Sequence, residues 1–117
     1  MLDEIREFAL ALAGSNESFP FDDETLVYKV GGKMFLVLAL EKRPIPITVK
    51  CKPEEGEQLR EQYNTIQPAY HFNKRHWITL TNPASLPFTL ICSLIRTSYD
   101  LVYSRLTRKE RQSIENA

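Results

Sequence analysis

The pattern of apolar and polar positions divides this chain of 117 residues into short amphipathic helices and alternating strands. Near the N-terminus, Leu2, Ile5, Ala9 and Leu12 recur at helical spacing, and Gly14 is a natural stop for the helix. Further along, apolar and polar residues alternate with the two-residue period of strands. The expected strands span residues 26–30, 33–40, 47–52, 66–70 and 76–81, and the other expected helices span residues 53–63 and 85–103 and a short segment from Thr107.

The first two strands are joined by Gly31-Gly32, which predicts a two-residue hairpin turn, because both glycines tolerate a positive φ. The order helix, hairpin, strand, helix, strand, helix predicts an α+β fold, an antiparallel β-sheet with helices packed on one face. With 43% hydrophobic and 26% charged residues, the chain is expected to form a single folded domain over residues 1–117.

Strand alternation sorts the side chains between the two faces of the expected sheet. The face predicted to lie under the helices is almost wholly apolar and carries Leu26, Tyr28, Val30, Met34, Leu36, Leu38, Leu40, Ile47, Val49 and Cys51. The opposite face is mixed and carries Val27, Lys29, Lys33, Phe35, Val37, Thr48, Lys50 and Lys52. Trp77 and Thr79 of the last strand are expected to share this second face, on which every charge is positive.

A formal net charge of zero hides a sorting of charge along the chain. Residues 1–27 hold seven acidic residues and one basic residue, whereas residues 28–52 hold six basic residues and one acidic residue. Residues 70–96 hold three basic residues and no acidic one. A basic surface is therefore compatible with an overall balance near zero.

The first candidate site is the basic sheet face, with its lysines 29, 33, 50 and 52. Lysines beside an exposed aromatic side chain, here Phe35 or Trp77, suit phosphate contact combined with stacking on nucleic-acid bases. The alternative interpretation is a solvated face whose lysines keep the sheet soluble and protect its edges.

The second candidate site is the segment Tyr70–Trp77, which includes Asn73, Lys74, Arg75 and His76. Basic, amide and aromatic groups within eight positions are typical of a loop that contacts phosphates or bases. The alternative is that the aromatic residues anchor the loop while its cations are merely solvated.

No catalytic residue, metal site or cofactor is predicted. His71 and His76 have no convergent partners at zinc-ligand spacing, and Cys51 is assigned to the core face, where a thiol is inert. No apolar run reaches the length of a membrane-spanning helix, and the acidic N-terminus is unlike a signal peptide, so we expect a cytoplasmic protein without a membrane association.

The chain resembles the MmcQ/YjbR family in blocks spread over nearly all of its length. The blocks are Phe19–Phe21, Tyr28–Phe35, Lys50–Glu54, Pro68–Trp77, Leu86-Pro87 and Ser98–Val102. The resemblance implies a frataxin/CyaY-like fold and a DNA-binding role, with no enzymatic activity established for the family. We therefore expect a monomer that binds nucleic acid, specifically DNA, through the basic sheet face and the Tyr70–Trp77 segment. The alternative is a protein-interaction module that binds an acidic partner through the same face.

Overall fold

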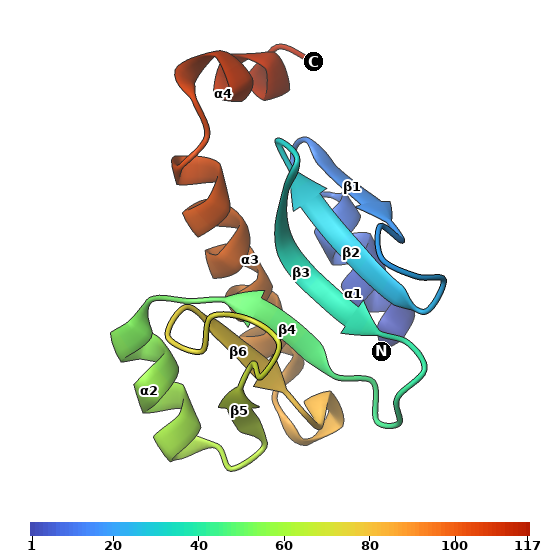
Figure 1. The fold of residues 1–117 in the computed structure, drawn as a ribbon, viewed down its shortest axis with the longest axis vertical. Coiled ribbons are helices and arrows are strands. Elements are labelled where there is room, and N and C mark those ends of the chain that lie inside the picture. The colour runs from blue at the N-terminus through green and yellow to red at the C-terminus, as the bar shows by residue number, and fades with distance from the viewer.

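The computed structural model describes residues 1–117 as a six-stranded sheet with four α-helices (Figure 1). The strands are β1 (Ser15–Ser18), β2 (Thr25–Val30), β3 (Lys33–Ala39), β4 (Ile47–Lys50), β5 (Ile66–Pro68) and β6 (Trp77–Leu80). The helices are α1 (Leu2–Leu10), α2 (Pro53–Gln62), α3 (Phe88–Ser104) and α4 (Arg108–Glu115), with a 3₁₀ turn, η1, at Pro83–Ser85. The strand order is β1-β2-β3-β4-β6-β5 and every neighbouring pair is antiparallel. The predicted α+β class and antiparallel sheet are confirmed, while β1 lies in a segment expected to be a loop.

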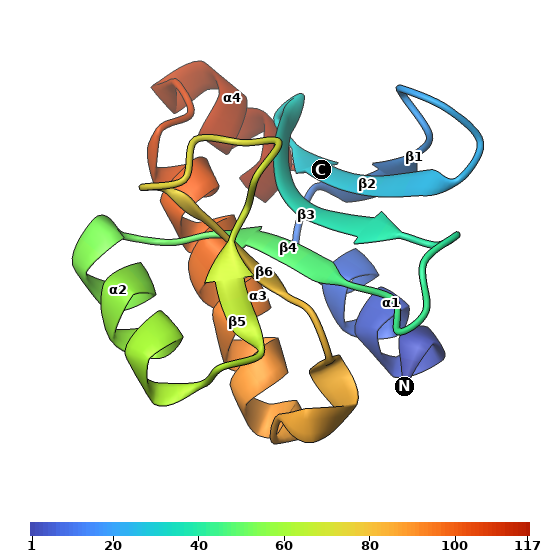
Figure 2. The ribbon, with the colours of Figure 1, turned by 60° about the horizontal axis from the view of Figure 1, so that its bottom comes forward.

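Helices α1 and α3 lie against one face of the sheet and leave its other face open (Figures 1 and 2). Helix α3 crosses β3 and β4, α1 packs beside α3 and β1, and α2 contacts the edge strand β5. Helix α4 lies beyond the end of α3. No helix has both the length and the hydrophobicity needed to cross a membrane.

The hydrophobic core fills the space between the sheet and these two helices. The predicted core face contributes eight buried residues to it, namely Leu26, Tyr28, Val30, Leu36, Leu38, Ile47, Val49 and Cys51, and Leu40 packs against them. Helix α3 supplies Ile91, Ile95, Ser98, Tyr99 and Val102 as its buried stripe. The two-residue alternation therefore predicted this face correctly, with Met34 as the exception.

A β-bulge in β3 breaks the expected alternation. The pairing steps from Tyr28 opposite Leu36 to Lys29 opposite Met34, so Phe35 is an extra residue on the β3 side. Phe35 turns into the core and is fully buried, with its ring centroid 5.4 Å from that of Tyr99. The prediction that Phe35 lies on the open face is therefore wrong.

The bulge also exchanges the faces of the two residues before Phe35. Met34 pairs with Lys29 on the open face, whereas Lys33 pairs with Val30, a core residue. Both differ from the prediction, because one extra residue flips every side chain between it and the turn. Lys50 pairs with Trp77 on the open face, as the alternation predicted.

The central strands β3 and β4 separate just beyond this bulge, and a serine from α3 connects them. Their pairing stops at Leu36 opposite Val49. From there, the Lys50 N–H donates to Ser98 Oγ at 2.8 Å, and the Ser98 hydroxyl donates to the Phe35 carbonyl at 2.6 Å. Ser98 is fully buried, so its hydroxyl satisfies two main-chain groups that would otherwise lack partners.

Replacing this hydroxyl should destabilise the fold. We expect Ser98→Ala to lower the free energy of unfolding by about 2 to 4 kcal/mol, because each buried, unpaired main-chain group costs roughly 1 to 3 kcal/mol. Urea-induced unfolding measures the change. Ser93→Ala, at an exposed position of the same helix, is the matched control and should leave stability almost unchanged. Equal stabilities of the two variants would show that the bridge contributes nothing.

Candidate functional site

A hollow lined by cations lies at the end of the sheet where β3 and β4 separate, between the open face and the helical layer. It has a volume of about 420 Å³ and is called here the basic hollow. Its lining residues are Lys29, Gly32, Lys33, Met34, Lys50, Trp77, Val102 and Arg105. Four of these eight residues are cationic and none is acidic.

Four elements bring the cations together. Lys29 and Lys33 stand on either side of the β2–β3 turn, and Lys50 ends β4 opposite Trp77. Arg105 follows the last residue of α3. Because Ser98, Val102 and Arg105 are spaced four and three residues apart, they lie along one face of the helix. The face of α3 that connects the separated strands therefore also supplies Val102 and Arg105 to the hollow.

The cations of the hollow have no ion-pair partner. The three salt bridges of the structure, at Glu4, Glu17 and Asp100, lie elsewhere. Burial lowers the pKa of Lys50, and the positive charges of Arg105 and Lys33 lower it further. A carboxylate near Lys33, that of Glu110, is held in the capping box of α4 by the N–H of Thr107. An anion entering the hollow would offset the mutual repulsion of Lys50, Lys33 and Arg105.

The Tyr70–Trp77 segment is an ordered loop beside the hollow. The Asn73 side chain accepts a hydrogen bond from the main-chain N–H of Arg75 at 3.0 Å, so it shapes the turn. The Lys74 ammonium lies 5.1 Å from the centroid of the Tyr70 ring. The rings of Phe72 and Trp77 are in contact, with centroids 5.1 Å apart.

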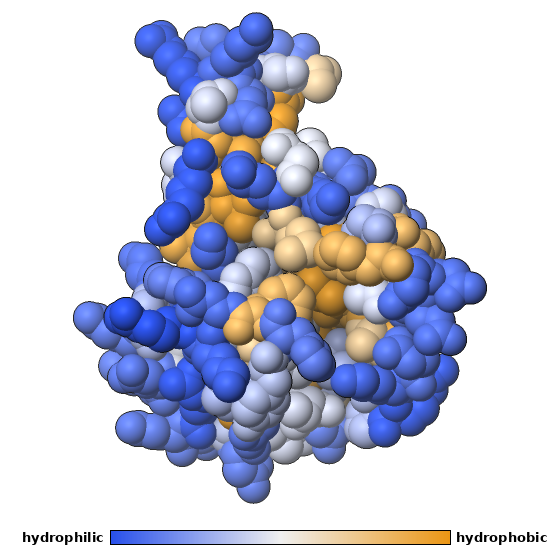
Figure 3. Space-filling view, in the orientation of Figure 1, coloured by the Kyte–Doolittle hydropathy of each residue, from blue (hydrophilic) through white to orange (hydrophobic).

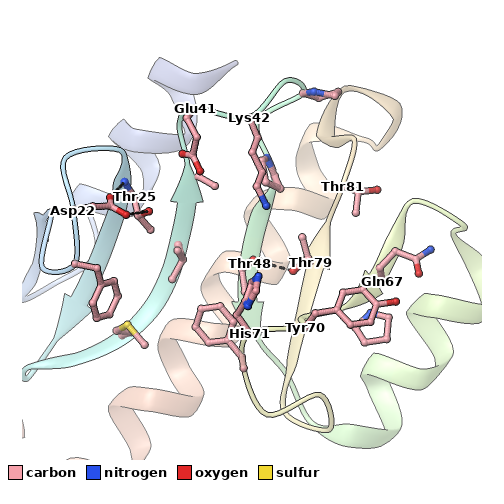
Figure 4. Close-up of a pocket in the computed structure, with 18 of the residues that line it drawn as sticks. Asp22, Thr25, Glu41, Lys42, Thr48, Gln67, Tyr70, His71, Thr79 and Thr81 are labelled. Carbon is pink, nitrogen blue, oxygen red and sulfur yellow. Dashed lines mark hydrogen bonds between the residues drawn. The ribbon is translucent and has the colours of Figure 1, made fainter.

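A second depression, the sheet groove, occupies the rest of the open face (Figure 4). It has a volume of about 990 Å³. The strands form its floor with Thr25, Met34, Val37, Ala39, Thr48, Gln67, Pro68 and Thr79. Loops form its walls with Phe21, Asp22, Glu41, Lys42, Arg43, Pro44, Pro46, Tyr70, His71, Phe72 and Thr81. The floor is uncharged, and apolar side chains gather over β2 and β3 within a hydrophilic surround (Figure 3).

The predicted site residues fall into three groups. Those that line the basic hollow are Lys29, Lys33, Lys50 and Trp77. Those that line neither cavity are Lys52, Asn73, Lys74, Arg75 and His76. Phe35 lies in the core. The open face is therefore basic only at its hollow end, and Lys52, the N-cap of α2, is not part of that end.

Sequence reasoning missed Arg105 and placed Met34 in the core. The only signal for Arg105 was a basic residue at the end of a helix, which equally fits an interaction with the helix dipole. Sequence reasoning also gave no role to Phe21, Lys42 or Gln67, although all three line the groove with Tyr70.

The remaining reactive groups do not gather at a site. No cluster of three or more His, Cys, Asp or Glu side chains is placed to hold a metal ion. His71 lines the groove and His76 does not. Both cysteines are free, and burial raises the pKa of each thiol, which disfavours the nucleophilic thiolate.

The fold and the site define a small α+β domain whose sheet is covered by helices on one face and has a cationic hollow where its two central strands separate. The YjbR family model matches residues 10–101 of the chain. The chain belongs to the YjbR family.

Relatives and solved structures agree with this membership. Escherichia coli O157:H7 protein YbdF is 33% identical over 110 residues, which cover 93% of this chain and 89% of YbdF. YjbR of Escherichia coli K12 is 31% identical over 112 residues, covering 95% and 94% of the two chains. Both carry the name "uncharacterized protein", which states no activity.

Two crystal structures share the fold. Deinococcus radiodurans protein DR2400, with a DUF419 domain, superposes with a TM-score of 0.91 at 39% identity, covering 98% of this chain and 88% of that one. A Pseudomonas syringae protein superposes with a TM-score of 0.70 at 26% identity, covering 86% and 97% of the two chains.

The unpaired cations predict a specific response to small anions. Millimolar pyrophosphate should raise the thermal midpoint of the wild-type protein by mass action, because it binds only the folded state. The double variant Lys50→Met/Arg105→Met should lose most of this rise. The matched control, Arg108→Met/Lys109→Met, removes two exposed charges outside the hollow and should keep the rise. An equal rise in all three proteins would contradict an anion site at the hollow.

The absence of a convergent ligand set predicts indifference to chelators. The protein should keep its thermal midpoint in excess EDTA, because a structural metal would couple its binding to folding. A drop of several degrees, restored by zinc, would show that His71 or His76 belongs to a metal site that the geometry does not reveal.

Proposed function

We propose that this protein is a DNA-binding protein rather than an enzyme, and that DNA phosphates occupy the basic hollow. The observation that carries the proposal is the meeting of four cations beside the half-buried ring of Trp77, in a hollow whose lining holds no acidic residue. Cations that neutralise phosphates supply most of the affinity in such complexes, and an adjacent aromatic ring adds stacking.

The state of Lys50 supports the same proposal. Partial burial and the positive charges of Arg105 and Lys33 lower the pKa of Lys50. A phosphate in the hollow would offset these effects and stabilise the charged form of Lys50. The chain as a whole is neutral, so binding would be confined to this end of the sheet.

We also propose that the fold is of the frataxin/CyaY type that the family resemblance implies. It is supported by the packing of α1 and α3 on one face of an antiparallel sheet. This likeness concerns architecture and adds nothing to the argument for DNA.

Titration with short DNA tests the proposed function through Trp77, the one tryptophan of the chain. Binding should quench or shift its fluorescence, and affinity should fall with salt. Four neutralised phosphates give a log–log slope of about −3 to −4. Lys33→Ala/Lys50→Ala should weaken binding and flatten the slope by about one unit per lost contact. Arg108→Ala/Lys109→Ala is the matched control and should keep the wild-type slope.

The alternative occupant of the hollow is an acidic segment of a partner protein. An unchanged Trp77 signal through high-micromolar DNA at low salt would contradict DNA binding and favour this alternative. A pull-down from nuclease-treated lysate then separates the two, because a protein partner survives nuclease and a nucleic acid does not. Loss of that partner with Lys33→Ala/Lys50→Ala would assign it to the hollow.

A further inference from the structure

We propose that the nucleic acid is single-stranded and that its unpaired bases enter the sheet groove while its phosphates bind at the basic hollow. The inference rests on the proposed function and adds to it the strand form and the place of the bases.

The hollow and the groove form one continuous track across the open face. Met34 lines both of them. Phe72 lines the groove and Trp77 lines the hollow, and their rings are in contact. A chain anchored by a phosphate at Lys50 can therefore continue into the groove without leaving the surface.

The two parts of the track differ in charge in a way that suits an unpaired strand. Beyond the hollow, the floor of the groove is uncharged, and the charges on its rim balance, with Asp22 and Glu41 against Lys42 and Arg43. A duplex presents one negative charge for every 1.7 Å or so of its axis, and a neutral floor with a balanced rim has no excess of cations to match it. An unpaired strand presents flat base faces and hydrogen-bonding edges instead.

Exposed aromatic side chains stand on opposite walls of the groove. Phe21 is 66% exposed and Tyr70 is 67% exposed, so both rings are accessible to a ligand. Figure 4 shows their two loops, marked by Asp22 and Tyr70, on either side of the floor. The Lys74 ammonium lies over the Tyr70 ring, so a base would stack on the ring's other face.

Polar groups on the floor are available to base edges. The Gln67 amide nitrogen donates to the Asn64 carbonyl at 2.6 Å, so the amide oxygen stays free to accept. The hydroxyls of Thr48 and Thr79 lie 2.9 Å apart and share one hydrogen, which leaves the second hydroxyl hydrogen to donate. Surfaces that hold single strands combine cations along the backbone, here those of the basic hollow, with aromatic rings that stack on bases.

Fluorescence anisotropy at low salt tests the inference with four labelled probes: one short oligonucleotide of mixed sequence as single-stranded DNA, the same sequence as single-stranded RNA, its DNA duplex and its RNA duplex. We expect single strands to bind more tightly than duplexes. Tyr70→Ala should weaken single-strand binding roughly fivefold to a hundredfold, as loss of one stacked base does, and leave duplex binding unchanged. Tyr70→Phe should restore it. The matched control is Phe88→Ala, an aromatic that is 41% exposed outside both cavities and should have no effect.

Each outcome decides one of the two proposals. Equal affinity for strands and duplexes, or equal effects of Tyr70→Ala and Phe88→Ala, would overturn the inference; a loss of binding in Lys33→Ala/Lys50→Ala would still support the proposed function. No binding of any probe would overturn both. Tighter binding of single-stranded RNA than of single-stranded DNA would support the inference of an unpaired strand but overturn DNA as the ligand of the proposed function.

Discussion

One hydroxyl group joins the helical layer to the sheet at the point where the two central strands separate. Ser98 accepts the hydrogen of the Lys50 N–H and donates its own to the carbonyl of Phe35, in full burial. Because the hydroxyl comes from α3, it sets how that helix is rotated against β3 and β4. Val102 and Arg105 follow on the same helix face, so the contact that closes the gap between the strands also decides which side chains line the hollow beside it.

Most of the fold could be predicted from the two-residue and 3.6-residue periods, because those periods reflect which side chains avoid water. The glycine hairpin was equally predictable, and both glycines have positive φ, 58° at Gly31 and 78° at Gly32. The bulge at Phe35 was not. Lys33-Met34-Phe35-Leu36 reads as a plausible alternation in either register, and only the packing of Phe35 against Tyr28 and Tyr99 decides between them. Arg105 escaped prediction for a related reason: the contact between the end of α3 and the hairpin is long-range.

Charge on the open face is distributed unevenly, and this distribution determines which kind of ligand the face favours. The alternation pattern predicted a mixed face whose charges are all positive, whereas the structure gathers cations at one end and leaves a groove with an uncharged, hydroxyl-bearing floor beside it. A uniformly basic face would attract any polyanion. A basic end next to an uncharged floor discriminates, because it favours a ligand that has a phosphate at one point and flat or polar groups at the next.

The β-bulge explains why this face is concave. In a regular β3, Phe35 would lie on the open face, Met34 would lie in the core, and Lys33 would stand in a flat row with Lys29 and Lys50. Such a strand could pair with β4 to its end, and α3 would then lie entirely beneath the sheet. The extra residue instead turns Phe35 into the core, ends the pairing after Leu36 and Val49, and lets Ser98 enter the gap. Bulges commonly redirect side chains next to functional sites. Here the bulge converts a flat basic surface into a hollow that includes a cation from the opposite layer.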